Sequence, residues 1–225
     1  MIPYPWSYSA LKTFTTCPAQ YHAVKVLKTA ADVKGEEARY GDYVHKQFEL
    51  YHWEGKPLPS DLAHHTQVLI DLAFRPGVKL LEAKLAVNRQ LQPCKFFAKD
   101  VWARGIVDFA AINGSSAYIV DYKTGKRTPN TDQLELCALL IFAAYPQVQQ
   151  CNAEYYMTQT QQFVPKIPRV IPRSHIPALW KKFIPDLKQY AEAFKTDIWQ
   201  ERPSGLCRGW CPVKQCAHWT PKQER

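Results

Sequence analysis

The chain has 225 residues, of which 46% are hydrophobic, and a formal net charge of +9 at pH 7. This length fits one large domain, or one domain with a small appendage, and the apolar fraction is enough for a sizeable core. The excess of basic residues favours a polyanionic partner, most often nucleic acid, over a merely soluble basic protein. No apolar run approaches the ~20 residues of a membrane span, and the N-terminus lacks the pattern of a secretory signal. We therefore expect a cytoplasmic protein with no membrane contact.

The first third of the sequence favours helices. Apolar periodicity predicts helices over 7–27, with a break near Pro18, and over 34–55 and 59–74. Acidic residues open the second of these helices, where they suit a helix N-terminus. Ser60 is the N-cap candidate of the third.

The remainder alternates strands and helices. Strand patterns occupy 79–91, 103–112 and 117–123, and the last two flank Asn113-Gly114, a pair typical of a tight hairpin turn. The later elements, in chain order, are a helix at 128–146, strands at 150–159 and 163–171, and a helix at 174–199. Prolines in the last strand predict an edge position. This order predicts an α/β fold with a mixed central sheet flanked by helices.

The predicted hairpin carries charged residues where strands usually have apolar ones. Asp108 lies in "GIVD", and Asp121 and Lys123 lie in "DYKTG". Since strand side chains alternate faces, Asp121 and Lys123 point the same way, and strand pairing can bring Asp108 to the same site. Neighbouring carboxylates repel each other unless a cation lies between them, and oxygen ligands suit Mg²⁺ or Mn²⁺. A lysine beside them indicates metal-assisted phosphodiester hydrolysis, whereas the alternative is a solvated surface ion pair.

Two further residues could join this site. His45, in "GDYVH", lies one helical turn after Gly41 and could supply a nitrogen ligand, although a single helical histidine is commonly structural. Glu82 is an acid inside an apolar strand, and its alternative role is an outward-facing edge residue.

A phosphate-binding role is predicted at the next helix. Gln133 lies one turn into the helix that follows "DYKTGKRTPNTD". Helix N-termini bind phosphates, and Lys126 and Arg127 precede this one, so we expect both to contact DNA. The alternative for Gln133 is a solvent-facing polar residue.

Taken in order, the motifs GDYVH, GIVD, DYKTG and DQ resemble the RecB-like branch of the PD-(D/E)XK nuclease superfamily. The resemblance covers most of the chain and implies a single domain over 1–225 with a restriction-endonuclease-like core. It implies a Mg²⁺- or Mn²⁺-dependent deoxyribonuclease, an exonuclease in preference to an endonuclease, of a bacterium or a phage-infected host. Because no P-loop motif is present, a helicase, or a recombination or CRISPR partner, would be a separate chain. The alternative is a catalytically silent DNA-binding or scaffolding protein of the same fold.

The resemblance also assigns roles to residues. The implied metal ligands are the side chains of His45, Asp108 and Asp121 and the carbonyl of Tyr122. The implied catalytic residues are Asp108, Asp121, Lys123, Glu82 and Gln133. In this group Lys123 is the catalytic lysine, Glu82 an additional acid near the metal or its water, and Gln133 a residue that organises the site or faces the phosphate.

Cysteines form a second pattern. Cys207, Cys211 and Cys216 are spaced C-x3-C-x4-C, and such clusters in a reducing compartment bind metal more often than they form disulfides. Three thiolates need a fourth ligand, for which Cys17 is the candidate.

The resemblance implies that these four cysteines hold a 4Fe–4S cluster that joins the two ends of the domain, as in AddB-type and CRISPR-associated adaptation nucleases. The Cys-rich segment 200–225 would then pack with the N-terminal helix. The relatives usually have C-x2-C-x5-C, so Zn²⁺ is the alternative, with His218 as a spare ligand. The other cysteines, Cys94, Cys137 and Cys151, are expected to be ordinary buried or half-buried thiols.

Overall fold

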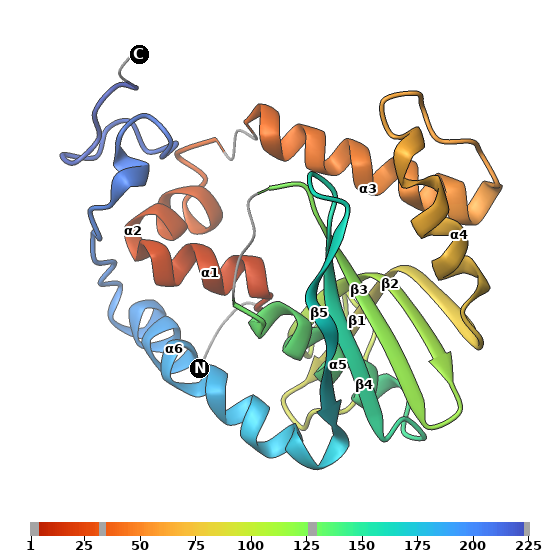
Figure 1. Ribbon diagram of the computed structural model, residues 1–225. Helices are drawn as coiled ribbons and strands as arrows, with labels where there is room; N and C mark the ends of the chain where they lie inside the picture. The colour runs from red at the N-terminus through yellow and green to blue at the C-terminus, as the bar shows by residue number, and fades with distance from the viewer. Residues whose placement is uncertain (1–4, 32–34, 126–129, 223–225) are drawn as a thin grey trace. The chain divides into compact units, whose positions relative to one another are not determined.

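The computed structural model describes residues 5–31, 35–125 and 130–222, and the backbone alone at 166–168 (Figure 1). The chain divides into two compact units. One is continuous, Gly35–Trp180, and the other combines the two ends, Met1–Lys34 and Lys181–Arg225. No described helix has both the length and the apolar character needed to cross a membrane.

The continuous unit is built on a five-stranded sheet in the order β1-β2-β3-β4-β5. Its strands are β1 (Val78–Asn88), β2 (Val101–Asn113), β3 (Ser116–Lys123), β4 (Gln150–Met157) and β5 (Gln162–Pro172). Only β3 and β4 pair in parallel, so the predicted mixed sheet is confirmed, as is the edge position of the proline-bearing β5.

The hairpin turn lies one residue later than predicted. Asn113 still pairs with Ser116, so the two turn residues are Gly114 and Ser115. Gly114 has a φ of 57°, a left-handed conformation that glycine adopts without steric cost.

Helices cover the sheet on both faces (Figure 1). They are α3 (Glu36–Glu54), α4 (Thr66–Phe74) and α5 (Asp132–Ala144). Residues of α3 and α4 share a buried core with Tyr118, Val120 and Tyr122 of β3. Because neighbouring strand residues point to opposite faces, Asp121 and Lys123 point away from that core, toward the face where α5 lies. This alternation places the charged residues of β3 beside the N-terminal end of α5.

Two helix predictions need correction. Ser60 does not cap α4: it accepts a turn hydrogen bond from Ala63 N at 3.4 Å, and a 3-10 turn, Ala63–His65, precedes the helix. Leu62 N donates a hydrogen bond to the carbonyl of Pro59, so the residues before α4 form a turn and the helix begins only at Thr66. The helix predicted over 128–146 begins at Asp132 and ends at Ala144, and every residue from 134 to 142 is buried, including Glu135, which is ion-paired with Arg169.

The unit formed by the chain ends contains α1 (Tyr8–Thr16), α2 (Pro18–Tyr21), the π-helical turn His22–Val26 and the greater part of α6 (Ile176–Thr196). The predicted break near Pro18 is present: Cys17 is extended, with φ −157° and ψ 106°, the conformation that a following proline favours. Edge-to-face contacts of Phe14, Tyr21 and Tyr190 form its aromatic core.

Acid should weaken the continuous unit through His65. This residue is 1% exposed, and its Nδ1 lies 2.8 Å from the hydroxyl of Tyr156. Burial, with the neighbouring His64, lowers the pKa of His65 to about 4. The unfolded chain therefore takes up a proton near pH 6.5 that the folded chain refuses, so stability is complete above pH 6.5 and falls between pH 6.5 and 4. One pKa unit corresponds to about 1.4 kcal/mol. We therefore expect the titration of His65 to lower the free energy of unfolding by roughly 3 kcal/mol between pH 7 and pH 4.

Urea unfolding at pH 7 and at pH 4 measures this loss. In His65→Gln the loss between the two pH values should be smaller than in the wild type, because the titrating group is gone. An exposed histidine elsewhere in the same unit provides the control, and His175→Gln should lose as much as the wild type. Equal losses in the wild type and His65→Gln would contradict the assignment.

Candidate active site

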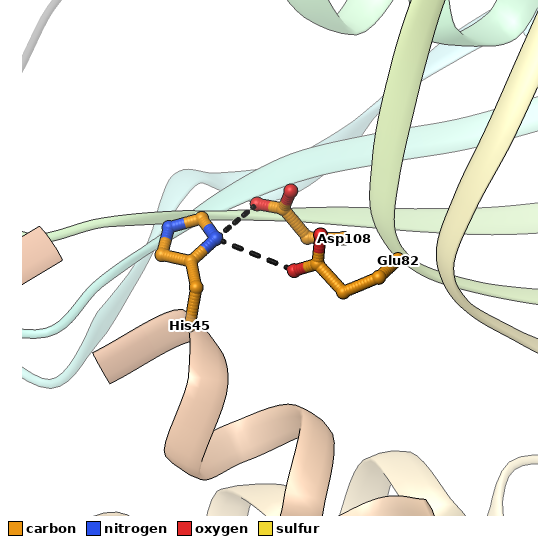
Figure 2. A group of neighbouring side chains, drawn as sticks. All are labelled: His45, Glu82 and Asp108. Carbon is orange, nitrogen blue, oxygen red and sulfur yellow. Dashed lines mark ion pairs between the residues drawn. The ribbon is translucent and has the colours of Figure 1, made fainter. Parts of the chain in front are cut away.

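Three side chains from different elements converge beside the sheet: His45 of α3, Glu82 of β1 and Asp108 of β2 (Figure 2). The Nδ1 atom of His45 lies 3.5 Å from Glu82 Oε1 and 3.5 Å from Asp108 Oδ2. Ligand-type atoms of the three residues all lie within 4.8 Å of one another. Among the described residues this is the only group of three or more His, Cys, Asp or Glu side chains gathered so closely.

Glu82 reaches this point through an unusual backbone conformation. Its φ is 46°, in the left-handed region that a non-glycine residue rarely adopts. The flanking pairs are Leu81 with Phe109 and Ala83 with Val107, so the irregularity is confined to Glu82 itself, opposite Asp108. Such strain costs on the order of 1 kcal/mol or more and is concentrated at functional sites.

Asp108 lies where β2 leaves β3. The last pair on this side of the two strands is Phe109 with Val120. Beyond this pair, Tyr122 N of β3 donates a hydrogen bond to Asp108 Oδ2 of β2 at 2.8 Å. A side-chain oxygen thus replaces the backbone carbonyl that would otherwise accept the next hydrogen bond between the two strands. Burial and the charge of Asp121 raise the pKa of Asp108 to about 8, although His45 opposes the rise.

Asp121 and Lys123 form an ion pair that Gln133 bridges. Lys123 Nζ lies 2.5 Å from Asp121 Oδ2 and donates to Gln133 Oε1 at 2.8 Å. Gln133 Nε2 in turn donates to Asp121 Oδ1 at 2.5 Å. The amide thus contacts both charged groups at once, and α5, which begins at Asp132, fixes their separation.

The surroundings of His45 favour its charged form. Its Nε2 lies 3.1 Å from the carbonyl of Tyr122, to which only a protonated nitrogen can donate, while Nδ1 faces the two carboxylates. Burial would lower the pKa of His45, but the hydrogen bond to Glu82 and the charges of Asp108 and Asp121 outweigh it and raise the pKa to about 9.

These residues border an open cavity of about 480 Å³. His45, Glu82 and Lys123 line it, together with Lys46 and Thr124. Gly41 lets α3 come close to β3: a Cβ atom at this position would lie 3.1 Å from Thr124 Oγ1. The cavity is large enough for a nucleotide-sized group beside the carboxylates.

The donor set fits a divalent cation. Glu82, Asp108 and Asp121 bring three carboxylates together, and burial raises the pKa of Asp121 as well as that of Asp108. Asp121 is 2% exposed, and its Oδ2 accepts no aligned hydrogen bond from the described residues despite the ion pair with Lys123. Buried oxygens with spare lone pairs, one imidazole and an open cavity are typical of Mg²⁺ or Mn²⁺ sites.

Comparison with known proteins identifies the family. The family model of the PD-(D/E)XK nuclease superfamily matches residues 5–216. The chain belongs to the PD-(D/E)XK nuclease superfamily. The crystal structure of a "Putative exonuclease" from Eubacterium rectale is 12% identical, with a TM-score of 0.53, and the match covers 95% of this chain and 86% of that one. A second crystal structure, of SSO0001, is 13% identical over 96% of this chain and 87% of that one, with a TM-score of 0.43. No curated protein matches.

The residues of the sequence motifs lie close together in space. The structure brings together His45, Glu82, Asp108, Asp121, Lys123 and Gln133, and places the Tyr122 carbonyl beside His45. Lys126 and Arg127 lie outside the described residues. In this arrangement Glu82, rather than Asp121, belongs to the tightest group with His45 and Asp108.

Sequence reasoning missed two features of this nuclease-superfamily site. One is the hydrogen bond between the Tyr122 amide and Asp108, for which the sequence gives no signal. The other is the left-handed backbone of Glu82, although an acid within an apolar strand was a partial signal.

The four cysteines of the predicted pattern line one pocket of about 200 Å³ in the unit of the chain ends. Arg202 N lies 3.5 Å from Cys17 Sγ, and Arg202 Nη1 donates to the carbonyl of Thr15 at 2.7 Å, so the C-terminal segment contacts the N-terminal helix region. Within the described ranges no three cysteine sulfurs approach within 4.8 Å of one another. Cys137 and Cys151 are buried and Cys94 is half-buried.

The strain at Glu82 can be tested by comparing two replacements. Glu82→Gly should be more stable than Glu82→Ala by roughly 1 kcal/mol, since glycine adopts a positive φ without the steric cost that alanine meets. At Lys84, an exposed position of the same strand, the order should be reversed because strand glycines are destabilising. Chemical denaturation measures all four variants, and the same order at both positions would contradict the strain.

Proposed function

We propose that this protein is a metal-dependent DNA nuclease that acts as an exonuclease. One observation carries the proposal: the carboxylates of Glu82, Asp108 and Asp121 lie close to a histidine and a lysine, and Glu82 lines an open cavity together with both of these basic residues. The superfamily match supports phosphodiester hydrolysis. The name of the Eubacterium rectale structure favours an exonuclease, and the net charge of +9 favours a polyanionic substrate.

In this proposal His45, Glu82, Asp108 and Asp121 hold Mg²⁺ or Mn²⁺, with the Tyr122 carbonyl as a further ligand. When bound, the cation neutralises phosphate charge and lowers the pKa of a water molecule. The carboxylates supply the negative charge that retains it. Since His45 is bonded both to the Tyr122 carbonyl and to two acids, it must release a proton before a ring nitrogen can act as a ligand.

Lys123 would act on the substrate phosphate. Its ammonium group lines the cavity next to Asp121, where it can stabilise the negative charge that develops on the phosphate during hydrolysis. Gln133 holds Lys123 by accepting one of its hydrogen bonds, and Asp121 holds it by charge. The lysine is therefore in place before DNA binds, and Lys126 and Arg127 would add contacts to the DNA backbone.

Cleavage of end-labelled DNA tests the site. Asp108→Asn and Asp121→Asn should abolish metal-dependent cleavage because each removes a carboxylate of the cation site. Lys123→Ala should lose ~10²-fold or more in rate, the loss typical of removing one electrostatic stabiliser, with little change in metal affinity. The matched control is Asp71→Asn, an exposed acid of α4 bonded to Gln67, which should cleave normally.

Linear and covalently closed circular DNA separate the modes of attack. An exonuclease degrades the linear DNA and leaves the circle intact. Cleavage by Asp121→Asn at the wild-type rate would exclude the site, and absence of cleavage by the wild type in both Mg²⁺ and Mn²⁺ would favour the DNA-binding or scaffolding alternative.

We further propose that Cys17, Cys207, Cys211 and Cys216 hold a 4Fe–4S cluster. All four line one pocket, and burial raises the pKa of Cys211, to which the charges of the other three thiols contribute. Zinc at a Zn–S distance of about 2.3 Å would require sulfurs about 3.8 Å apart. The wider spacing favours a cluster, whose thiolates bind four separate iron atoms. Zn²⁺ is the alternative, and His218, which lies 3.2 Å from Glu201, would be its spare ligand.

Replacing any one of the four cysteines with serine should lower the yield of folded protein and remove iron and sulfide, since metal binding contributes to folding free energy. Iron, sulfide and zinc analysis of anaerobically purified protein makes the measurement. Cys94→Ser is the control and should retain the metal. Stoichiometric zinc without iron would support the alternative, and no bound metal would exclude both.

A further inference from the structure

Beyond the acidic site, β1 and β2 continue as a two-stranded arm. Lys84 pairs with Ile106, and Ala86 pairs with Arg104. Lys84 and Ile106 are exposed, whereas the next pair beyond Ala86 and Arg104, Val87 with Ala103, lies on the other face and is 0% exposed. Directly opposed residues of antiparallel strands share a face, so Lys84, Ile106 and Arg104 lie together on the outer face of the arm.

The loop that joins these strands carries an exposed aromatic pair. Phe97 is 78% exposed, and its ring centroid lies 5.0 Å from that of Phe96. The guanidinium of Arg104 lies 5.0 Å from the ring of Phe96 and 5.8 Å from that of Phe97, and Arg104 Nη1 donates to the carbonyl of Phe96 at 3.4 Å. Arg104 thus anchors the pair to the outer face while one face of Phe97 stays in water.

Positive charge surrounds this aromatic pair. Lys84, Lys95 and Lys99 are exposed, and Arg104 lies beneath the rings. Asp100 is the only acidic residue between positions 83 and 106. An exposed aromatic ring among cations provides both a base-stacking surface and partners for phosphates.

From these observations we infer that the outer face of the arm binds single-stranded DNA and leads it to the acidic site. This inference rests on the proposed nuclease function and adds its substrate class. Phe97 stacks on an unpaired base, and the cations contact the phosphates on either side. A duplex keeps its bases stacked inside and cannot offer one to Phe97. Asn88 lies six residue steps along β1 from Glu82, which is roughly 20 Å at strand spacing. This distance is a reach of a few nucleotides.

Fluorescence anisotropy in EDTA tests binding without cleavage, with a labelled 15-nucleotide oligo(dT) and a 15-base-pair duplex as probes. Phe97→Ala should bind oligo(dT) about tenfold more weakly or worse, the loss that removal of one stacking contact causes, while duplex binding changes little. Phe97→Trp should retain the binding of oligo(dT). The control is Phe74→Ala, which removes an 85% exposed phenylalanine at the end of α4 and should leave both affinities unchanged.

Wild-type affinity for oligo(dT) in Phe97→Ala would overturn the inference, and so would an equal loss for oligo(dT) and duplex. In both cases metal-dependent cleavage with loss in Asp121→Asn would still leave the proposed function standing. A wild-type protein that binds neither probe would also overturn the inference, whereas cleavage in Mg²⁺ or Mn²⁺ would still decide the proposed function. If Phe97→Ala instead changes only self-association, measured by sedimentation, the ring serves a protein contact and the inference fails.

Discussion

The carboxylates of Glu82, Asp108 and Asp121 lie close together where β2 separates from β3, and their mutual repulsion sets the requirements for the residues around them. Removal from water adds to this cost, because a buried anion without a partner is strongly unfavourable. The protein offsets part of it with one histidine, one lysine and one backbone amide. The remaining negative charge favours the binding of a cation, and the strands of the sheet hold the residues that carry it.

The compensating groups come from α3, β3 and α5, so the site requires these three elements of the continuous unit to fold together. His45 comes from α3, which shares a core with one face of β3, and Gln133 comes from α5 near the other face. The strand between them alternates, with Tyr122 packed in the core and Asp121 and Lys123 on the opposite side. Residues more than 80 positions apart in the sequence thus act on one group of oxygens, and a shift of one residue in β3 would exchange a tyrosine for an acid.

Periodicity was sufficient to predict the five strands and the mixed sheet, and motif order was sufficient to predict that His45, Asp108 and Asp121 lie near one another. They were insufficient where a local conformation depends on tertiary contacts. The left-handed φ of Glu82 accompanies the contact of its side chain with His45 of α3, a tertiary partner that no pattern within β1 records. Ser60 was a plausible cap by residue type, yet the turn from Pro59 moved the start of α4 to Thr66. Gln133 bridges Asp121 and Lys123 because α5 meets β3 at this point. Sequence spacing alone could not decide whether Gln133 organises the site or faces the phosphate.

The division of the chain has a consequence for how the protein is made. In the sequence, the continuous unit, Gly35–Trp180, is flanked by the two segments that form the other unit. All of its residues therefore leave the ribosome before those of the C-terminal half of the other unit, Lys181–Arg225. Domains generally fold as units during synthesis, beginning with those that emerge first. We expect the acidic site to assemble while Cys17 is still without Cys207, Cys211 and Cys216, so that the last segment to leave the ribosome closes the unit with which the chain began.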